Sequence, residues 1–206
     1  MLRAVVAAAV LAAPARVPAT VEEQRARLPP PATCTDLIEG VWQAHRYNPP
    51  FGDWMIYTLT VRRVHRATSG SGALAGTIEA HSWTGGPAQS EPPPCAPGIR
   101  HWVVAQDARG SYDSATRGIA FGAYNWRVQS VLCAPWAGYH PDQFTGTIDP
   151  ALQEFISVNN DGGRAVNEPV LFRRVGCLDD LGRAHPVVTP PPFTPPRHPG
   201  CNREVD

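Results

Sequence analysis

The chain has 206 residues, the length of one ordinary domain with tails. Its 18 basic side chains balance 18 acidic ones, so the formal net charge is zero. This balance argues against a nucleic-acid binder, which needs a basic face, and against a polybasic membrane anchor. All 18 basic residues are arginines. The absence of lysine excludes phosphate-loop nucleotide hydrolysis and Schiff-base chemistry, including that of pyridoxal cofactors.

Residues 1–15 have the pattern of a secretory signal peptide. Arg3 supplies a positive start, residues 4–13 are uniformly apolar, and Ala13-Pro14-Ala15 has the small-x-small form of a cleavage site. The apolar run is too short to span a bilayer, which takes about 20 residues. We therefore expect a secreted or periplasmic protein without a membrane span. The alternative is a disordered N-terminal tail or a misassigned start codon.

Residues 16–33 are rich in Arg, Glu, Pro and Ala and are predicted to be a linker, with a short helical turn over residues 21–28. From residue 34 to residue 177 the pattern becomes that of β-strands. Segments rich in β-branched and aromatic residues, with partial two-residue alternation, are separated by Gly, Pro, Asp or Ser clusters. They cover residues 40–47, 54–64, 73–83, 100–109, 117–128, 142–148, 153–159 and 169–176.

No helix-length window has a convincing 3.6-residue period, so the crossover helices of a parallel sheet are missing. The fold class predicted is therefore all-β, a single antiparallel up-and-down barrel of about eight strands, with a β-sandwich as the alternative. Alternation predicts which side chains face the interior. Those predicted inward are Met55, Tyr57, Leu59 and Val61, then Leu74, Gly76, Ile78 and Ala80, and later Phe144, Gly146 and Ile148.

Four of the five cysteines flank predicted strands. In a closed antiparallel barrel the first strand begins beside the end of the last, so Cys34 should pair with Cys177. If the fourth and fifth strands form a hairpin, Cys95 and Cys133 meet at one end of it and should also pair. Cys201 is left over in the proline-rich tail, residues 178–206. Disulfides agree with an oxidising compartment; the alternative is a cytosolic protein with five reduced cysteines.

Gly40-Val41-Trp42, at the head of the first predicted strand, resembles the Gly-x-Trp motif of lipocalins and the wider calycin superfamily. The resemblance covers about 140 residues in general layout. It implies that Trp42 plugs the barrel floor and that an arginine near the end of the last strand packs across it. Arg173 or its neighbour Arg174 is the counterpart, and Arg173 is the residue assigned here. The resemblance further implies a binder of small apolar or amphipathic molecules at the open end of the barrel.

The six tryptophans are the first candidates for ligand contacts, because an indole combines a large flat surface with one N–H donor. Trp102 and Trp126 lie within predicted strands and are expected to line a core or a cavity. By parity, Trp54 and Trp83 lie on more polar faces, and Trp136 lies in a loop. These three could form an exposed recognition surface for sugar or peptide, although packing is the simpler role for each.

The most polar part of the predicted barrel is the stretch of residues 157–168. Its amides and carboxylates lie together at one rim, where they could orient a polar group of a ligand. The alternative is that they serve only the chemistry of a hairpin turn. The residues assigned to ligand binding here are Asn160, Asp161, Asn167 and Glu168.

No motif supports a reaction, a metal or a cofactor. The sequence has no Gly-x-Ser-x-Gly element, no HExxH, no CxxC and no paired-histidine spacing, although five histidines lie in or near predicted strands. We therefore assign no catalytic residue, metal ligand or cofactor. The function predicted is a secreted or periplasmic binding module for a small molecule. The alternative is a structural or protein-interaction domain that uses the proline-rich residues 190–196 as a polyproline ligand. An enzyme of unknown reaction is a third and less favoured alternative.

Overall fold

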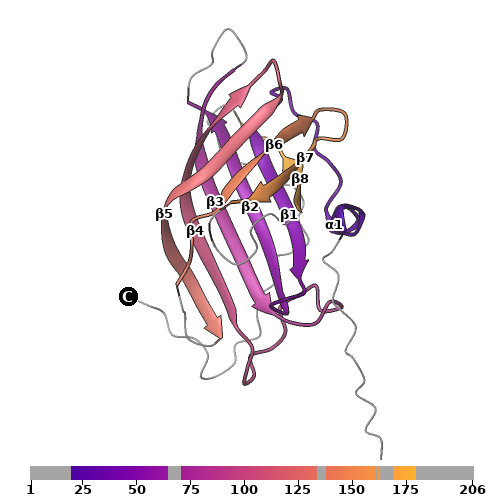
Figure 1. Cartoon of the computed structure of the whole chain (residues 1–206), viewed down its shortest axis with the longest axis vertical. Coiled ribbons are helices and arrows are strands. Elements are labelled where there is room, and N and C mark those ends of the chain that lie inside the picture. Colours follow the sequence, from indigo (N-terminus) through magenta and orange to yellow (C-terminus); the bar gives the residue numbers. More distant parts are fainter. Residues whose placement is uncertain (1–19, 65–70, 134–137, 161, 163–168, 180–206) are drawn as a thin grey trace, which may run out of the picture.

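The computed structural model describes residues 20–64, 71–133, 138–160, 162 and 169–179. Eight strands form one closed barrel in chain order, each antiparallel to its neighbours (Figure 1). This confirms the predicted up-and-down barrel and excludes the sandwich. The elements are α1 (Val21–Arg27), β1 (Gly40–Asn48), β2 (Asp53–Arg63), β3 (Gly72–Thr84), β4 (His101–Asp113), β5 (Gly118–Cys133), β6 (Gln143–Asp149), β7 (Glu154–Asn159) and β8 (Pro169–Gly176).

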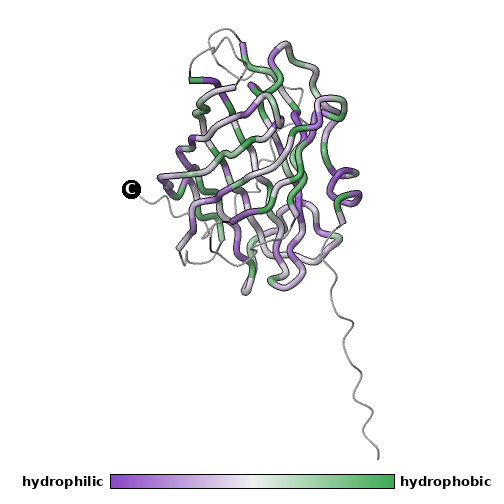
Figure 2. Tube along the Cα trace, turned by 45° about the horizontal axis from the view of Figure 1, so that its top comes forward, coloured by the Kyte–Doolittle hydropathy of each residue, from purple (hydrophilic) through white to green (hydrophobic). Residues whose placement is uncertain are grey.

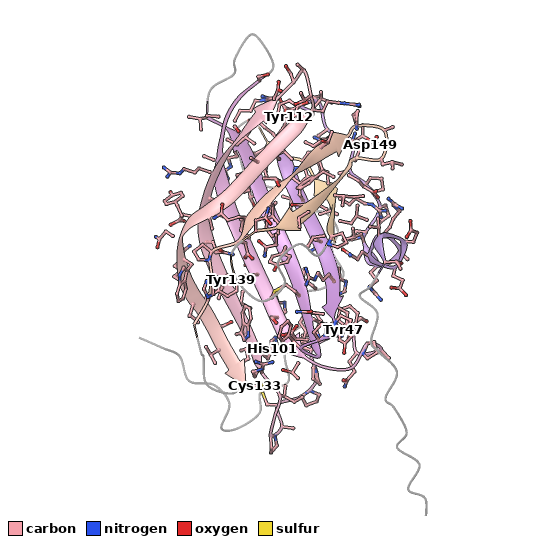
Figure 3. All side chains as sticks on the ribbon, viewed as in Figure 1. Tyr47, His101, Tyr112, Cys133, Tyr139 and Asp149 are labelled. Atoms are coloured by element: carbon pink, nitrogen blue, oxygen red, sulfur yellow. A yellow bond between two sulfur atoms is a disulfide. The ribbon has the colours of Figure 1, made fainter. Side chains whose placement is uncertain are left out.

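The up-and-down order gives the barrel two different ends. The connections β1–β2, β3–β4, β5–β6 and β7–β8 all lie at one end, which we call the mouth end. The other end, the floor end, holds the chain entering β1 and the three remaining connections. Figure 3 labels Tyr47, His101 and Cys133 near the mouth end and Tyr112 and Asp149 near the floor end.

Hydrophobic and hydrophilic residues alternate along the strands (Figure 2). Of the residues predicted to face inward, Tyr57, Leu59, Ile78, Phe144 and others are buried in one continuous cluster. Aromatic rings run through its centre, with centroid separations of 5.0 Å for Tyr57 and Phe144 and 4.8 Å for Phe144 and Phe172. Each fully buried large apolar side chain contributes about 1.5–3 kcal/mol, so this cluster is the main source of stability.

A register shift in β5 changes which side chains face the interior. Asp107 pairs with Asn125 and Ala108 pairs with Ala123, so Tyr124 is an extra residue on β5 and is exposed. Because a bulge inserts one extra residue, odd-numbered residues face inward on one side of it and even-numbered residues face inward on the other. As a result, Ala123 and Trp126 both lie on the inward side although one has an odd and the other an even residue number.

Three glycines allow adjacent strands to bend close together. A Cβ atom at Gly76 would lie 1.8 Å from the carbonyl oxygen of Thr60 on β2. At Gly110 and Gly146 it would lie 1.9 Å and 2.3 Å from carbonyl oxygens of the neighbouring strands. Glycine is therefore required at these positions for the barrel to curve.

Replacing Gly76 with alanine is expected to lower the free energy of unfolding by about 2–3 kcal/mol, because the strand must move away from Thr60. Equilibrium unfolding in urea measures the loss. Gly86→Ala is the matched control, since the nearest atom to its Cβ, Gln89 Oε1, lies 3.7 Å away. Equal stability of the two variants would contradict the close approach of β2 and β3.

The chain before β1 packs on the outside of the barrel. The α1 helix begins with a capping box formed by Thr20 and Glu23 and contacts β8 and β1. The Gln24 side chain is buried; it donates to the Pro169 carbonyl (3.0 Å) and accepts from the Leu171 N–H (3.0 Å). Residues 20–33, within the segment expected to be a linker, are thus attached to the barrel wall.

Both predicted disulfides are present. Cys34 bonds to Cys177 across 143 residues, and Cys95 bonds to Cys133 across 38 residues. The first joins the chain just before β1 to the chain just after β8, as barrel closure requires. The second ties the β3–β4 connection to the end of β5. Cys201 lies outside the described residues.

Candidate functional site

The floor of the barrel is built around Trp42. Its ring is fully buried, and its indole N–H donates to the Ile38 carbonyl at 2.9 Å. The Arg174 guanidinium lies 5.4 Å from the ring centroid and donates to the backbone carbonyls of Asp36 and Glu39. The cation and the polypeptide before β1 therefore cover Trp42 together and close this end.

The arginine over Trp42 is Arg174, which corrects the assignment to Arg173. A register shift at Val41 and Trp42 brings Trp42 opposite Arg174 and places Arg173 opposite Gln43, on the outward side. There Arg173 forms an ion pair with Glu154 at 2.6 Å. Burial lowers the pKa of Arg174, but arginine remains charged in proteins and keeps its cationic contact with the ring.

A buried carboxylate lies inside the barrel toward the mouth end. The Asp142 carboxylate accepts hydrogen bonds from Gln106 Nε2 (2.5 Å), the Tyr139 hydroxyl (2.5 Å) and Asn159 Nδ2 (2.9 Å). The Asp142 N–H also donates to Gln106 Oε1 at 3.0 Å. Three donors compensate for removing the carboxylate from water. β4 and β7 each contribute one member of this network, Gln106 and Asn159, and the chain preceding β6 contributes Tyr139 and Asp142.

The network holds the Tyr139 ring inside the barrel, beside two tryptophans. The ring centroids of Tyr139 and Trp102 are 5.4 Å apart, and those of Tyr139 and Trp126 are 6.3 Å apart. Trp102 and Tyr139 also pack on the central hydrophobic cluster. The arrangement thus combines flat apolar surfaces with one fixed polar group.

Three inward-facing side chains at the mouth end are partly exposed, although Arg46 and Ser82 on the same side are buried. Leu59 and Ile78 are fully buried, whereas Met55, Trp102 and Trp126 are partly exposed. Met55, Trp102 and Trp126 therefore contact solvent although their strands place them on the inward side.

The polar rim is only partly described. Asn160 is exposed directly after β7, and its backbone N–H donates to the Gln143 carbonyl at 3.0 Å. Asp161, Asn167 and Glu168 lie outside the described residues, so their proximity to Trp102 and Trp126 stays a prediction. Sequence reasoning missed Tyr139 and Asp142. The inward parity of Phe144, extended back by two residues, was the available signal for Asp142.

Trp54 and Trp83 lie on the outer face, as parity predicts, but they are not exposed. Their exposed fractions are 0% and 1%, which overturns the predicted recognition surface for these two. The β3–β4 connection covers them: Trp54 Nε1 donates to the Gly86 carbonyl (2.9 Å) and Trp83 Nε1 to the Gln89 carbonyl (3.1 Å). Arg27 lies over Trp54 at 5.0 Å. Trp136 is outside the described residues.

Comparisons with protein-family models, curated proteins and solved structures found no match. Within the described ranges, no helix is long and apolar enough to cross a membrane. The same residues contain no group of three or more His, Cys, Asp or Glu side chains placed to hold a metal ion. The proline-rich residues 190–196 lie outside the described chain, so binding of a protein partner through them stays a prediction.

Proposed function

We propose that the chain is a binding protein for one small apolar or amphipathic molecule, held at the mouth end of the barrel. The observation that carries this proposal is the partial exposure of inward-facing Met55, Trp102 and Trp126, beside a polar network centred on Asp142. Small-molecule sites are mostly apolar with a few fixed polar groups that set orientation. The lining described here has that composition.

The two ends of the barrel support the proposal in different ways. At the floor end, Trp42 and Arg174 close the interior, and the central aromatic cluster occupies the middle. Among the described residues, this closed floor supports entry of the proposed ligand from the mouth end. The Gly40-Val41-Trp42 sequence together with the stacked arginine agrees with the resemblance to lipocalins, which implies binding at this end.

The proposed location is outside the cytoplasm, in a secreted or periplasmic setting. Disulfides persist in oxidising compartments, and two bonds tie this barrel together. The signal-peptide pattern of residues 1–15 supports the same location. Mass spectrometry of the protein purified from its own host tests this, since removal of the leader and oxidation of Cys34 and Cys177 change the measured mass.

Replacing Trp126 with alanine is expected to weaken binding of the amphipathic dye anilinonaphthalene sulfonate by about tenfold, or about 1.4 kcal/mol. The variant removes a partly exposed indole from the proposed site. Dye fluorescence titrated against the folded full chain measures the dissociation constant, and Trp102→Ala is expected to give a similar loss.

Tyr124→Ala is the matched control, because Tyr124 lies on the same strand but is exposed on the outside. Near-ultraviolet circular dichroism of each variant establishes that its packing is intact, since loosely packed states also bind this dye. Absence of saturable binding to the wild-type chain, or an equal loss in Tyr124→Ala, would refute a site at the mouth end.

A further inference from the structure

The outer face of β1–β4 at the mouth end carries an unusual number of rings. The strand register places eight side chains there in two adjacent rows, each of which crosses all four strands. The first row is Tyr47, Trp54, Trp83 and His101, and the second is His45, Ile56, His81 and Val103. The rows thus bring three histidines from different strands to one face.

Two of these histidines face each other directly. His81 on β3 and His101 on β4 are diagonal neighbours, because His81 pairs with Val103 and His101 pairs with Trp83. Their Nε2 atoms are 2.7 Å apart, and their rings are nearly parallel, at 19° with centroids 5.0 Å apart. One Nε2–H donates to the other Nε2, so the two nitrogens point at each other.

Burial lowers the pKa of both imidazoles, and the proximity of His81 lowers the pKa of His101 further, to about 4. Both rings are therefore neutral near pH 7. Neutral imidazole is the form that binds transition metals. The acceptor Nε2 already has a free lone pair. The donor ring binds a metal through Nε2 after its proton moves to Nδ1, a change of tautomer that releases no proton from the pair.

The spacing is close to that of two ligands on one ion. Nitrogens bound at about 2.0–2.1 Å to the same ion lie about 3 Å apart when their bonds are nearly perpendicular. The present separation of 2.7 Å reaches this value when it widens by a few tenths of an ångström and each ring turns to aim its Nε2 at one common point. His101 is buried, whereas His81 is partly exposed, so solvent can fill the remaining coordination positions from the side of His81.

We propose that His81 and His101 form a two-imidazole site for a divalent transition-metal ion, filled preferentially by Cu²⁺ and more weakly by Zn²⁺. Imidazole nitrogens favour these ions over Mg²⁺, and affinity in such sites peaks at Cu²⁺. Arg100, next to His101, is 3.9 Å from Asp53, which partly offsets its charge. With only two protein ligands, we expect micromolar affinity. The ion would link β3 to β4 at the end from which their connection leaves.

Isothermal titration with CuCl₂ tests the site in the untagged, oxidised full chain carrying Cys201→Ser, which removes a competing cysteine. We expect binding of one equivalent, weaker binding of ZnCl₂ and none of MgCl₂. His81→Ala and His101→Ala should each weaken Cu²⁺ binding by at least tenfold. His140→Ala, which removes an exposed histidine elsewhere, should leave it unchanged.

Electron paramagnetic resonance of the Cu²⁺-loaded chain gives an answer that does not depend on whether the variants fold. Coupling of copper to two imidazole nitrogens, together with a rise in the unfolding temperature on metal addition, is the expected result. No Cu²⁺ binding, a spectrum without two imidazole nitrogens, or equal affinity in folded His81→Ala would overturn the proposal.

Discussion

Replacing both Cys34 and Cys177 with serine is expected to lower the free energy of unfolding by about 4–5 kcal/mol. Their bond spans 143 residues, and a cross-link that closes a long loop removes more entropy from the unfolded chain. The loss is a large fraction of the free energy of unfolding of a typical protein, which is roughly 5–15 kcal/mol. Urea unfolding of the oxidised wild type and the double variant measures it.

Replacing Cys95 and Cys133 with serine gives the matched comparison. Their bond spans 38 residues, so the chain-entropy effect is smaller by about 1 kcal/mol. We also expect the first double variant to fray where β1 meets β8, which hydrogen exchange of the Val41 and Gly176 amides would detect. A greater loss of stability from the Cys95–Cys133 replacement would contradict the entropic account of barrel closure.

Lowering the pH from 7 to 4 is expected to destabilise the barrel through His45. Burial, with the charge of Arg27 as a second cause, lowers the pKa of His45 to about 4 from an ordinary value of 6.5. The unfolded chain therefore takes up the proton first as the pH falls. The stability due to neutral His45 is complete above pH 6.5, falls between 6.5 and about 4, and is absent below that range. The full lowering of the His45 pKa corresponds to a change of at most about 3 kcal/mol in the free energy of unfolding.

His45→Phe isolates this contribution, because phenylalanine keeps a ring beside Trp54 and Trp83 but cannot take up a proton. The variant should lose less stability than the wild type between pH 7 and pH 4, as measured by urea unfolding at each pH. His140→Phe, at an exposed position, should match the wild type. Identical pH profiles for His45→Phe and the wild type would show that the charge of His45 does not affect folding.

The alternation of side chains was enough to predict the barrel and most of its interior. Tyr57, Leu59, Ile78 and Phe144 were assigned inward from local parity and are buried. The disulfide partners followed from closure, because only a ring brings the beginning of β1 beside the end of β8. The inward faces depend only on neighbouring residues in the sequence. The disulfide partners depend on one further assumption, that the sheet closes into a barrel.

The candidate site was less predictable, because it depends on register. The shift at Val41 and Trp42 selects Arg174 over Arg173 as the cation above Trp42, and no local pattern encodes that shift. The burial of Trp54 likewise depends on the β3–β4 connection folding back over the outer face. Parity correctly placed that indole outside the barrel but could not show what covers it.

By itself, the sequence determined an antiparallel ring of eight strands, its two disulfides and the inward faces of β2 and β3, because turn residues and two-residue alternation act over short stretches of chain. Only the tertiary structure decided that Asp142 meets Gln106, Tyr139 and Asn159, and that His81 meets His101. These contacts join residues on separate strands or in irregular connections. One step of register moves a side chain by about 3.3 Å and turns it to the opposite face, so such contacts form only after the whole ring has closed.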